Sequence, residues 1–323
     1  NNNNNNKRLV TRHMSHNASY ANRRLNHNDT SVFENITSDN SDVDSNDLPD
    51  MINNYLISVA KSVSPLQSDL LDNLRAELID CPVEFIVSEF DVYMKLVKLN
   101  VRKASLCSTI DNRLLYKLAD VLAAPICALI NTSIRQGLVP EQWKLSRISP
   151  IPKNIPVMRI DNDIRPIAVT CPISKIAESF VSSLFNQHFV DHLDVNQHGS
   201  TKGRSTVTAL IHFSHSIFVA SDDNRNIIRL LFVDFSKAFD LIDHSVLYKK
   251  LTDLEFPAHV RLWSLSFVQQ RKQFVKLGNY VSNVIISNAG APQGTLAGPD
   301  DFKLLINDLR FDTTYIKYVD DVS

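Results

Sequence analysis

Three aspartates directly follow apolar runs that have the composition of buried strands. Asp234 follows residues 227–233, and Asp320 and Asp321 follow residues 314–319. Carboxylates brought together at strand ends form a set of hard oxygen ligands that suits Mg²⁺. Two such ions about 3.5–4 Å apart can activate an attacking hydroxyl and stabilise a leaving oxygen in phosphoryl transfer. An isolated Asp-Asp pair is more often only a turn, so this chemistry needs further signals in the same chain.

Several short motifs accompany these aspartates in order along the chain. They are Ile-Pro-Lys at 151–153, Arg-Pro-Ile at 165–167, Gln-His-Gly-Ser-Thr-Lys-Gly-Arg-Ser-Thr at 197–206, Leu-Phe-Val-Asp-Phe-Ser-Lys-Ala-Phe-Asp at 231–240, Ala-Pro-Gln-Gly-Thr-Leu-Ala-Gly-Pro at 291–299, Ile-Asn-Asp-Leu at 306–309 and Tyr-Val-Asp-Asp at 318–321. In this order they resemble the fingers and palm motifs of reverse transcriptases. The segments 197–206 and 306–309 are typical of the jockey-like, LINE-type branch of non-LTR retrotransposons.

The resemblance implies an α+β right-hand polymerase that performs RNA-directed DNA synthesis. A primer 3′-OH would attack the α-phosphate of a dNTP, and pyrophosphate would leave. Asp234, Asp320 and Asp321 would be both the catalytic residues and the ligands of two Mg²⁺ ions, with Mn²⁺ as an alternative. The implied partners are an RNA template, a DNA primer and dNTPs. The intact proteins of this branch usually also carry an upstream endonuclease domain.

The resemblance also assigns contacts to the incoming nucleotide. Lys153 and Arg165 would hold the triphosphate, since an ammonium is a compact charge and a guanidinium suits a bidentate phosphate contact. Phe239, five positions after Asp234, would be an aromatic steric gate that crowds a ribose 2′-OH. RNA-dependent RNA polymerases commonly carry Asp at that offset, whereas here the next Asp is Asp240, which favours DNA synthesis. Taken singly, the two cations read as solvated surface charges and Phe239 as a core residue.

Two glycine-containing motifs imply contacts with template and nucleotide. Gln293 can offer an amide contact, and Gly294 lets its loop approach a nucleotide closely. Lys202 and Arg204 would contact template phosphates. The competing interpretations are a structural turn for the first pair and solvated surface charges for the second.

A stretch at 259–278 carries four basic residues and no acidic one. Arg271, Lys272 and Lys276 fit binding to a nucleic-acid backbone without regard to sequence. Its aromatic residues stand at helical or strand spacing, which favours a core role over base stacking; they are Trp263, Phe267 and Phe274.

Composition limits the classes of protein to which the chain can belong. Its 323 residues are 44% hydrophobic and 21% charged, which rules out wholesale disorder, a collagen-like repeat and a coiled coil. The longest apolar stretch, 118–130, is shorter than the roughly 18 residues of a membrane-spanning helix, and no signal peptide is recognisable. We therefore expect an intracellular protein, in nucleus or cytoplasm, and a fragment, since residue 1 is Asn. The spacing of the four cysteines indicates reduced thiols and no zinc site.

The expected organisation has three parts. Residues 1–50 are a disordered polar arm, 51–140 a helical region that precedes the polymerase, and 141–323 a truncated domain of fingers and incomplete palm, with the thumb absent. Further expectations are a helix after Asp111 that ends at Gly137, a buried strand at 227–233, and a hairpin that turns at Gly278-Asn279. The apolar stripe expected for the first of these helices consists of Leu114, Leu115, Leu118, Val121, Leu122, Ile126 and Leu129.

The end of the chain departs from the family pattern. Only two residues follow Asp321, so the return strand after the Tyr-Val-Asp-Asp motif is expected to be missing, together with the primer grip and the helical thumb. We therefore expect this chain by itself to fold incompletely and to polymerise poorly. Two alternatives to an active reverse transcriptase remain open. One is a decayed relic that binds nucleic acid without catalysis, and the other is an RNA-dependent RNA polymerase.

Overall fold

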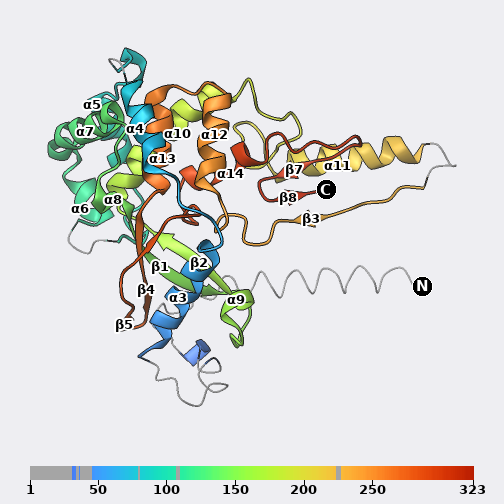
Figure 1. Cartoon of the computed structure of the whole chain (residues 1–323), viewed down its shortest axis with the longest axis horizontal. Coiled ribbons are helices and arrows are strands. Elements are labelled where there is room, and N and C mark those ends of the chain that lie inside the picture. The colour runs from blue at the N-terminus through green and yellow to red at the C-terminus, as the bar shows by residue number, and fades with distance from the viewer. Residues whose placement is uncertain (1–30, 34–35, 37–45, 79–80, 107–109, 223–226) are drawn as a thin grey trace.

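The computed structural model describes residues 31–33, 36, 46–78, 81–106, 110–222 and 227–323. Within them, the expected mixture of helices and strands is confirmed: a helical body lies above a larger sheet, and a smaller sheet lies to one side (Figure 1). No helix in this part of the chain is both long and apolar enough to span a membrane.

The larger sheet has the strand order β2-β1-β4-β5, and β6 also pairs with β4. The strands are β1 (Leu145–Pro152), β2 (Ile164–Val169), β4 (Arg271–Leu277), β5 (Tyr280–Val281) and β6 (Ile285–Ser287). β1 and β2 form an antiparallel hairpin that includes the short helix α9 (Ile160–Asp163), and β1 runs parallel to β4. Both extended runs expected near 148–153 and 165–169 are therefore confirmed, as is the hairpin turn at Gly278.

One helix from the N-terminal part of the chain packs on this sheet. α3 (Leu48–Ala60) contacts β4 and β6, and Leu48 and Ile52 are buried. Phe33 in the short helix η1 (Ser31–Phe33) and Ile36 are buried in the same cluster. This described portion of the expected arm is therefore packed, while most of residues 1–45 lies outside the described residues.

The helical body draws its helices from both halves of the chain. They are α4 (Ser68–Ala76), η2 (Val83–Phe85), α5 (Glu89–Leu96), α6 (Asn112–Lys117), α7 (Ala119–Gln136), α8 (Glu141–Lys144), α10 (Pro172–Phe189), α12 (His244–Asp253), α13 (Ala258–Val268) and α14 (Ala297–Leu305). The Trp263 ring stacks on Phe267 with centroids 5.4 Å apart, and its indole Nε1 donates to the Ser133 hydroxyl oxygen at 3.0 Å. Both rings are buried, so the expected core role of these aromatics is confirmed.

The helix expected after Asp111 differs from the prediction in two respects. It is broken at Leu118 into α6 and α7, although it ends as expected at Gly137, which has a left-handed conformation. The stripe was also assigned the wrong phase, because Leu118 and Val121 are exposed. Leu115 and Ile126 of the expected stripe are buried. The rest of the buried face includes two small side chains that a search for large apolar residues passes over, Ala119 and Ala123, together with Ile130 and Ile134.

The smaller sheet has the strand order β3-β8-β7. It consists of β3 (Val233–Asp234), β7 (Lys317–Tyr318) and β8 (Asp321–Val322). The expectation of a missing return strand was wrong, because β8 turns back and pairs with β7. Backbone hydrogen bonds in both directions between Ile316 and Ser323 close this hairpin.

The expectation of a buried strand at 227–233 was also wrong. Its apolar side chains have exposed fractions from 38% to 85%, and only Val233 belongs to a strand. The neighbouring helix α11 (Thr206–Ser221) runs beside it (Figure 1), yet among its residues only Ala209 is buried. A strand is buried only when both faces are covered, and within the described residues α11 supplies a contact on one side, between Phe213 and Phe232.

A layer of buried polar groups joins α10 to α14. The Lys303 ammonium forms an ion pair with Asp300 at 2.9 Å and donates to the Asn186 side-chain oxygen at 3.1 Å. The neighbouring Asp301 is also buried, and its Oδ2 has no hydrogen-bond partner among the described residues. An unpaired buried carboxylate destabilises a fold, so Asp301 reduces the stability of this layer whenever it is ionised.

Replacing Asp301 by Asn is therefore expected to stabilise the fold at neutral pH. Burial, followed by the nearby Asp300 and Glu178, raises the pKa of Asp301 well above its ordinary value. A carboxyl group with a raised folded-state pKa does not reduce stability at low pH, where it is protonated in both states. The loss of stability begins as the pH rises past the unfolded-state pKa and grows until the pH reaches the folded-state pKa. The free energy of unfolding of the wild type, minus that of D301N, should thus become more negative above about pH 4.

Urea denaturation between pH 4 and pH 8 measures this difference. Asp312→Asn is the matched control, because Asp312 is exposed and its replacement should change stability little at any pH in this range. The same pH dependence of the unfolding free energy in wild type and D301N would contradict the assignment.

Candidate active site

The three predicted catalytic aspartates line one open cleft between the two sheets. The cleft has a volume of about 590 Å³, and Asp234, Asp320 and Asp321 lie along it. Other walls come from the β1–β2 hairpin, α3 and residues 235–240. The structure thus brings together carboxylates that are more than 80 positions apart in the chain.

Strand pairing brings the aspartates together. Asp234 in β3 is the register partner of Asp321 in β8, so their side chains lie on the same face of the antiparallel pair. Asp320 lies in the tight turn between β7 and β8, next to Val319, which has a positive φ of 58°. Paired Cα atoms lie about 4.5–5.5 Å apart and neighbouring ones about 3.8 Å, which puts the Cα atoms of Asp234 and Asp320 within about 9 Å.

The carboxylates in this cleft repel one another. Desolvation by partial burial, followed by the charges of Asp320 and Asp234, raises the pKa of Asp321 above its ordinary value. Among the described residues, no three His, Cys, Asp or Glu side chains are grouped closely enough to hold a metal ion in their present conformations. The donor set still fits a hard divalent cation, because all three groups offer carboxylate oxygens from adjacent backbone positions and a cation would relieve their repulsion.

Hydrogen bonds from the segment 196–199 hold the turn that carries Asp320. The Gln197 side-chain oxygen accepts hydrogen bonds from the Gly199 N–H at 2.9 Å and the Val319 N–H at 3.1 Å. The His198 N–H donates to the Lys317 carbonyl at 2.8 Å, and the Lys317 N–H donates to the Asn196 carbonyl at 2.9 Å. These bonds give the motif at 197–206 a structural role in seating the hairpin.

A buried ion pair anchors the same hairpin from inside. The Lys317 ammonium lies 2.7 Å from the Asp194 carboxylate, and both side chains are almost fully buried. Burial alone would raise the pKa of Asp194, but its bonds to Lys317 and the Asn196 N–H hold the pKa below its ordinary value. The Tyr315 hydroxyl donates to the same carboxylate at 3.0 Å. The sequence analysis did not identify Lys317 and Asp194 as a structural ion pair. The sequence signal that could have pointed to it is the lysine inside an otherwise apolar predicted strand.

Four of the predicted nucleotide-contacting residues line the cleft: Lys153, Arg165, Phe239 and Gln293. Both cations are exposed at its edge, and Phe239 is half-buried with its ring 5.6 Å from Phe302. The Gln293 side chain hydrogen-bonds Asp240, and burial raises the pKa of that carboxyl group despite this bond.

Other predicted residues lie elsewhere. Gly294 lines a neighbouring cavity of about 420 Å³, and Lys202 a third of about 600 Å³. The Arg204 guanidinium donates to the carbonyls of Val195 and Gln197, so it braces the loop that clasps the hairpin.

The expected nucleic-acid role of Arg271 was wrong. Its guanidinium is buried, which lowers its pKa to about 10, and it donates to the Ser146 hydroxyl oxygen at 2.7 Å. Lys272 forms an ion pair with Glu141 at 3.1 Å. Of the three, only Lys276 is exposed and forms no ion pair in the described part of the chain, and it lines the cavity that holds Gly294.

Comparison with known proteins agrees with the motifs. Residues 151–323 match the family described as reverse transcriptase (RNA-dependent DNA polymerase). The chain is 28% identical over 251 residues to the probable RNA-directed DNA polymerase from transposon BS of Drosophila melanogaster, covering 76% of this chain and 27% of that protein. It is 26% identical over 216 residues to the RNA-directed DNA polymerase from mobile element jockey of the same organism, covering 66% and 23%.

A third relative extends this picture. The probable RNA-directed DNA polymerase from transposon X-element of Drosophila melanogaster is 26% identical over 259 residues, which cover 79% of this chain and 28% of that protein. The expected resemblance to the jockey-like branch is therefore confirmed. The chain spans about a quarter of the length of the relatives it matches.

Replacing Gly199 by Ala is expected to loosen the aspartate-bearing hairpin. An added Cβ would lie 2.4 Å from the Val319 nitrogen and 2.8 Å from the Tyr318 carbonyl carbon, both of them backbone atoms that cannot rotate away. Overpacking of this kind destabilises a protein by roughly 1–3 kcal/mol. Hydrogen exchange of the amides at 315–323 should therefore become faster.

Gly203→Ala provides the matched control in the same loop. An added Cβ there meets no atom within 4 Å, so only its positive φ of 79° opposes the substitution. This variant should lose some stability while the amides at 315–323 keep their protection. If the amides at 315–323 exchanged hydrogen equally slowly in G199A and in the wild type, the loop would not be what holds the hairpin in place.

Proposed function

The chain belongs to the reverse transcriptase (RNA-dependent DNA polymerase) family, and from this premise we propose that it catalyses RNA-directed DNA synthesis for a mobile element. One observation carries the proposal: Asp234 pairs in register with Asp321, in a cleft that Lys153 and Arg165 also line. Carboxylates and cations that line one open cleft suit a substrate with a metal-bound triphosphate.

The reaction joins a primer 3′-oxygen to the α-phosphorus of a dNTP. A new P–O bond forms while the bond from the α-phosphorus to the bridging oxygen breaks, and pyrophosphate leaves with the electron pair. Asp234, Asp320 and Asp321 would hold divalent ions, Mg²⁺ or Mn²⁺. Such ions, when bound, activate the attacking hydroxyl and neutralise charge on the leaving phosphates.

The remaining cleft residues orient the nucleotide. Lys153 and Arg165 are exposed at the edge formed by the β1–β2 hairpin, where they can meet the β- and γ-phosphates. Phe239 packs against Phe302, so its ring is supported from behind and can crowd a 2′-hydroxyl group. The Gln293 side chain is held by Asp240 on the same wall.

The proposed partners follow from this reaction. They are an RNA template, a DNA primer and dNTPs, and the protein would act inside the cell, where these are found. Because the relatives are several times longer than this chain, we include an upstream endonuclease domain of the intact protein in the proposal.

Replacing Asp234 by Asn is expected to weaken metal-dependent nucleotide binding. The substitution keeps the shape of the side chain and removes the charge that faces Asp321 across the strand pair. With the chain bound to a DNA primer on an RNA template, the affinity for fluorescent dTTP in Mg²⁺ should fall at least about tenfold, as expected for loss of a charged ligand. Labelled dNTP incorporation, where detectable, should be lost with it.

Asp243→Asn is the control, because Asp243 caps α12 and lies outside the cleft. It should bind dTTP as the wild type does. Equal binding of dTTP by wild type in Mg²⁺ and in a metal chelator, or by wild type and D234N, would overturn the polymerase assignment. A chain that still binds RNA, but whose dTTP binding depends neither on Mg²⁺ nor on Asp234, would favour the alternative of a decayed relic that binds nucleic acid without catalysis.

Replacing Phe239 by Ala is expected to weaken discrimination against ribonucleotides. The smaller side chain leaves room for a 2′-hydroxyl, so the ratio of dATP affinity to ATP affinity should fall about tenfold, the scale of a steric fit in one pocket. Competition against fluorescent dTTP measures both affinities in one experiment. Phe311→Ala, at an exposed position outside the cleft, should leave the ratio unchanged. A wild type that already prefers ATP would support the RNA polymerase alternative.

A further inference from the structure

A helix that precedes the family match forms one wall of the cleft. The match begins at residue 151, whereas Tyr55, Leu56 and Val59 in α3 line the same cleft as Asp234. Figure 1 shows α3 against the face of the sheet formed by β1, β2 and β4. Residues far upstream of the polymerase motifs therefore face the space that the nucleotide would occupy.

α3 is held firmly in this position by a buried asparagine. The Asn53 amide nitrogen donates to the Ser282 hydroxyl oxygen at 3.0 Å and to the Asn283 carbonyl at 2.9 Å. The Gln273 amide nitrogen donates back to the Asn53 side-chain oxygen at 2.9 Å. Because Asn53 is fully buried and bonded on both sides of its amide, the helix cannot rotate about its axis without breaking this network.

The Tyr55 hydroxyl contacts the only lysine of the motif at 231–240. Lys237 follows Asp234 by three positions, and its ammonium donates to the Tyr55 hydroxyl oxygen at 2.5 Å. Lys237 has a positive φ of 53°, which is unusual for a lysine. Both side chains are half-buried in the cleft wall, so the contact fixes where the Lys237 charge lies.

Within the described residues this ammonium forms no ion pair, although its charge acts on Asp240 and Asp161. No carboxylate among them lies within the 4.0 Å ion-pair distance of the Lys237 nitrogen. Its hydrogen-bond partner is a neutral phenol, which leaves two ammonium protons for another acceptor. Lys153 and Arg165 line the same cleft. Lys237 is thus one of three cations that line this cleft together with the three aspartates.

We propose that Lys237 is a third phosphate-binding cation of the nucleotide site and that Tyr55 is its positioning residue. This inference rests on the proposed polymerase function and extends it to a helix outside the family match. A nucleoside triphosphate carries up to four negative charges, more than Lys153 and Arg165 neutralise. The Tyr55 hydroxyl holds the Lys237 ammonium beside the motif that carries Asp234, where the phosphates of a metal-bound nucleotide would lie.

The competing role for Lys237 is purely local. Its charge also acts on Asp240, a largely buried carboxyl group in the same wall, and Lys237 could serve only to stabilise that group. A local role predicts lower stability without a change in nucleotide selectivity. A phosphate-binding role predicts weaker binding of dTTP but not of dTMP, since dTMP lacks the β- and γ-phosphates.

A double-mutant cycle separates the two roles. With the chain bound to a DNA primer on an RNA template in Mg²⁺, competition against fluorescent dTTP gives the affinities for dTTP and dTMP. Lys237→Ala should lower the preference for dTTP about tenfold, as expected for the loss of one charged hydrogen bond. Tyr55→Phe should lower it about three- to tenfold. In the Lys237→Ala background, Tyr55→Phe should add nothing, because it acts only through Lys237.

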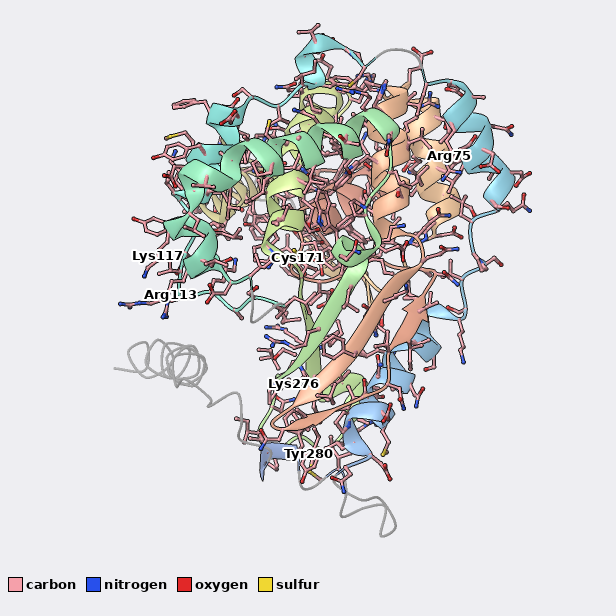
Figure 2. All side chains as sticks on the ribbon, turned by 90° about the vertical axis from the view of Figure 1, so that its left-hand side faces the viewer. Arg75, Arg113, Lys117, Cys171, Lys276 and Tyr280 are labelled. Carbon is pink, nitrogen blue, oxygen red and sulfur yellow. The ribbon has the colours of Figure 1, made fainter. Side chains whose placement is uncertain are left out.

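Matched controls come from outside the cleft. Lys117→Ala removes an exposed lysine on α6, and Tyr280→Phe removes an exposed hydroxyl near the tip of the hairpin formed by β4 and β5. Both residues are labelled in Figure 2, and neither lines the cleft. Neither should alter the preference. Lys237→Arg keeps the charge and should retain most of the preference, which tests the proposal even where the alanine variant folds poorly.

The outcomes distinguish this inference from the proposed function. If dTTP binding depended neither on Mg²⁺ nor on Asp234, the polymerase assignment itself would be overturned. Normal metal-dependent binding together with an unchanged dTTP-to-dTMP preference in Lys237→Ala would overturn only the role of Lys237. An equal effect of Tyr55→Phe with and without Lys237 would overturn the positioning role of Tyr55.

Discussion

The cleft depends on one buried ion pair, between Lys317 and Asp194. Neither group has water around it, so each needs the other as its counterion. The Lys317 ammonium also donates to the Ile306 carbonyl at 2.8 Å, which ties the strand before Asp320 to the end of α14. Without this anchor, a sheet whose strands pair over two residues each would have little to hold its register.

That anchor allows the cleft to tolerate carboxylates that repel one another. The pairing of Asp234 with Asp321 puts like charges on directly opposite positions, an arrangement that by itself disfavours the strand pair. The Gln197 side-chain oxygen accepts hydrogen bonds from the backbone N–H groups of Gly199 and Val319. These bonds do not depend on charge, and they offset that repulsion. The structure therefore keeps the backbone positions of the acidic residues together, although their side chains are not grouped closely enough to hold a metal ion in their present conformations.

Motifs and turns could be predicted from the sequence, because each depends on local chemistry. The hairpin turn at Gly278 and the helix end at Gly137 both follow from short-range rules of conformation. The burial of whole faces could not be predicted in this way. Residues 227–233 have the composition of a core strand, but composition does not say what covers them, and here most of that run is exposed.

Contacts between segments that are distant in the chain could not be predicted from the sequence either. The Asp194 partner of Lys317, the Tyr55 partner of Lys237 and the loop-bracing role of Arg204 join residues with no shared spacing pattern. Arg271 was misassigned for a related reason. A basic residue in a basic stretch suggests a polyanion partner, whereas hydrogen bonds to Ser146 and a helix carbonyl account for its burial.

The position of α3 bears on where the folded unit around the cleft begins. Sequence similarity to the family starts at residue 151, but Asn53 bonds this helix to β4 and to the loop between β5 and β6. A protein trimmed to the region of similarity would lose a whole side of the cleft and uncover the apolar face of the sheet beneath Ile52. Packing therefore extends the folded unit around the cleft about a hundred residues upstream of the boundary that homology alone would draw.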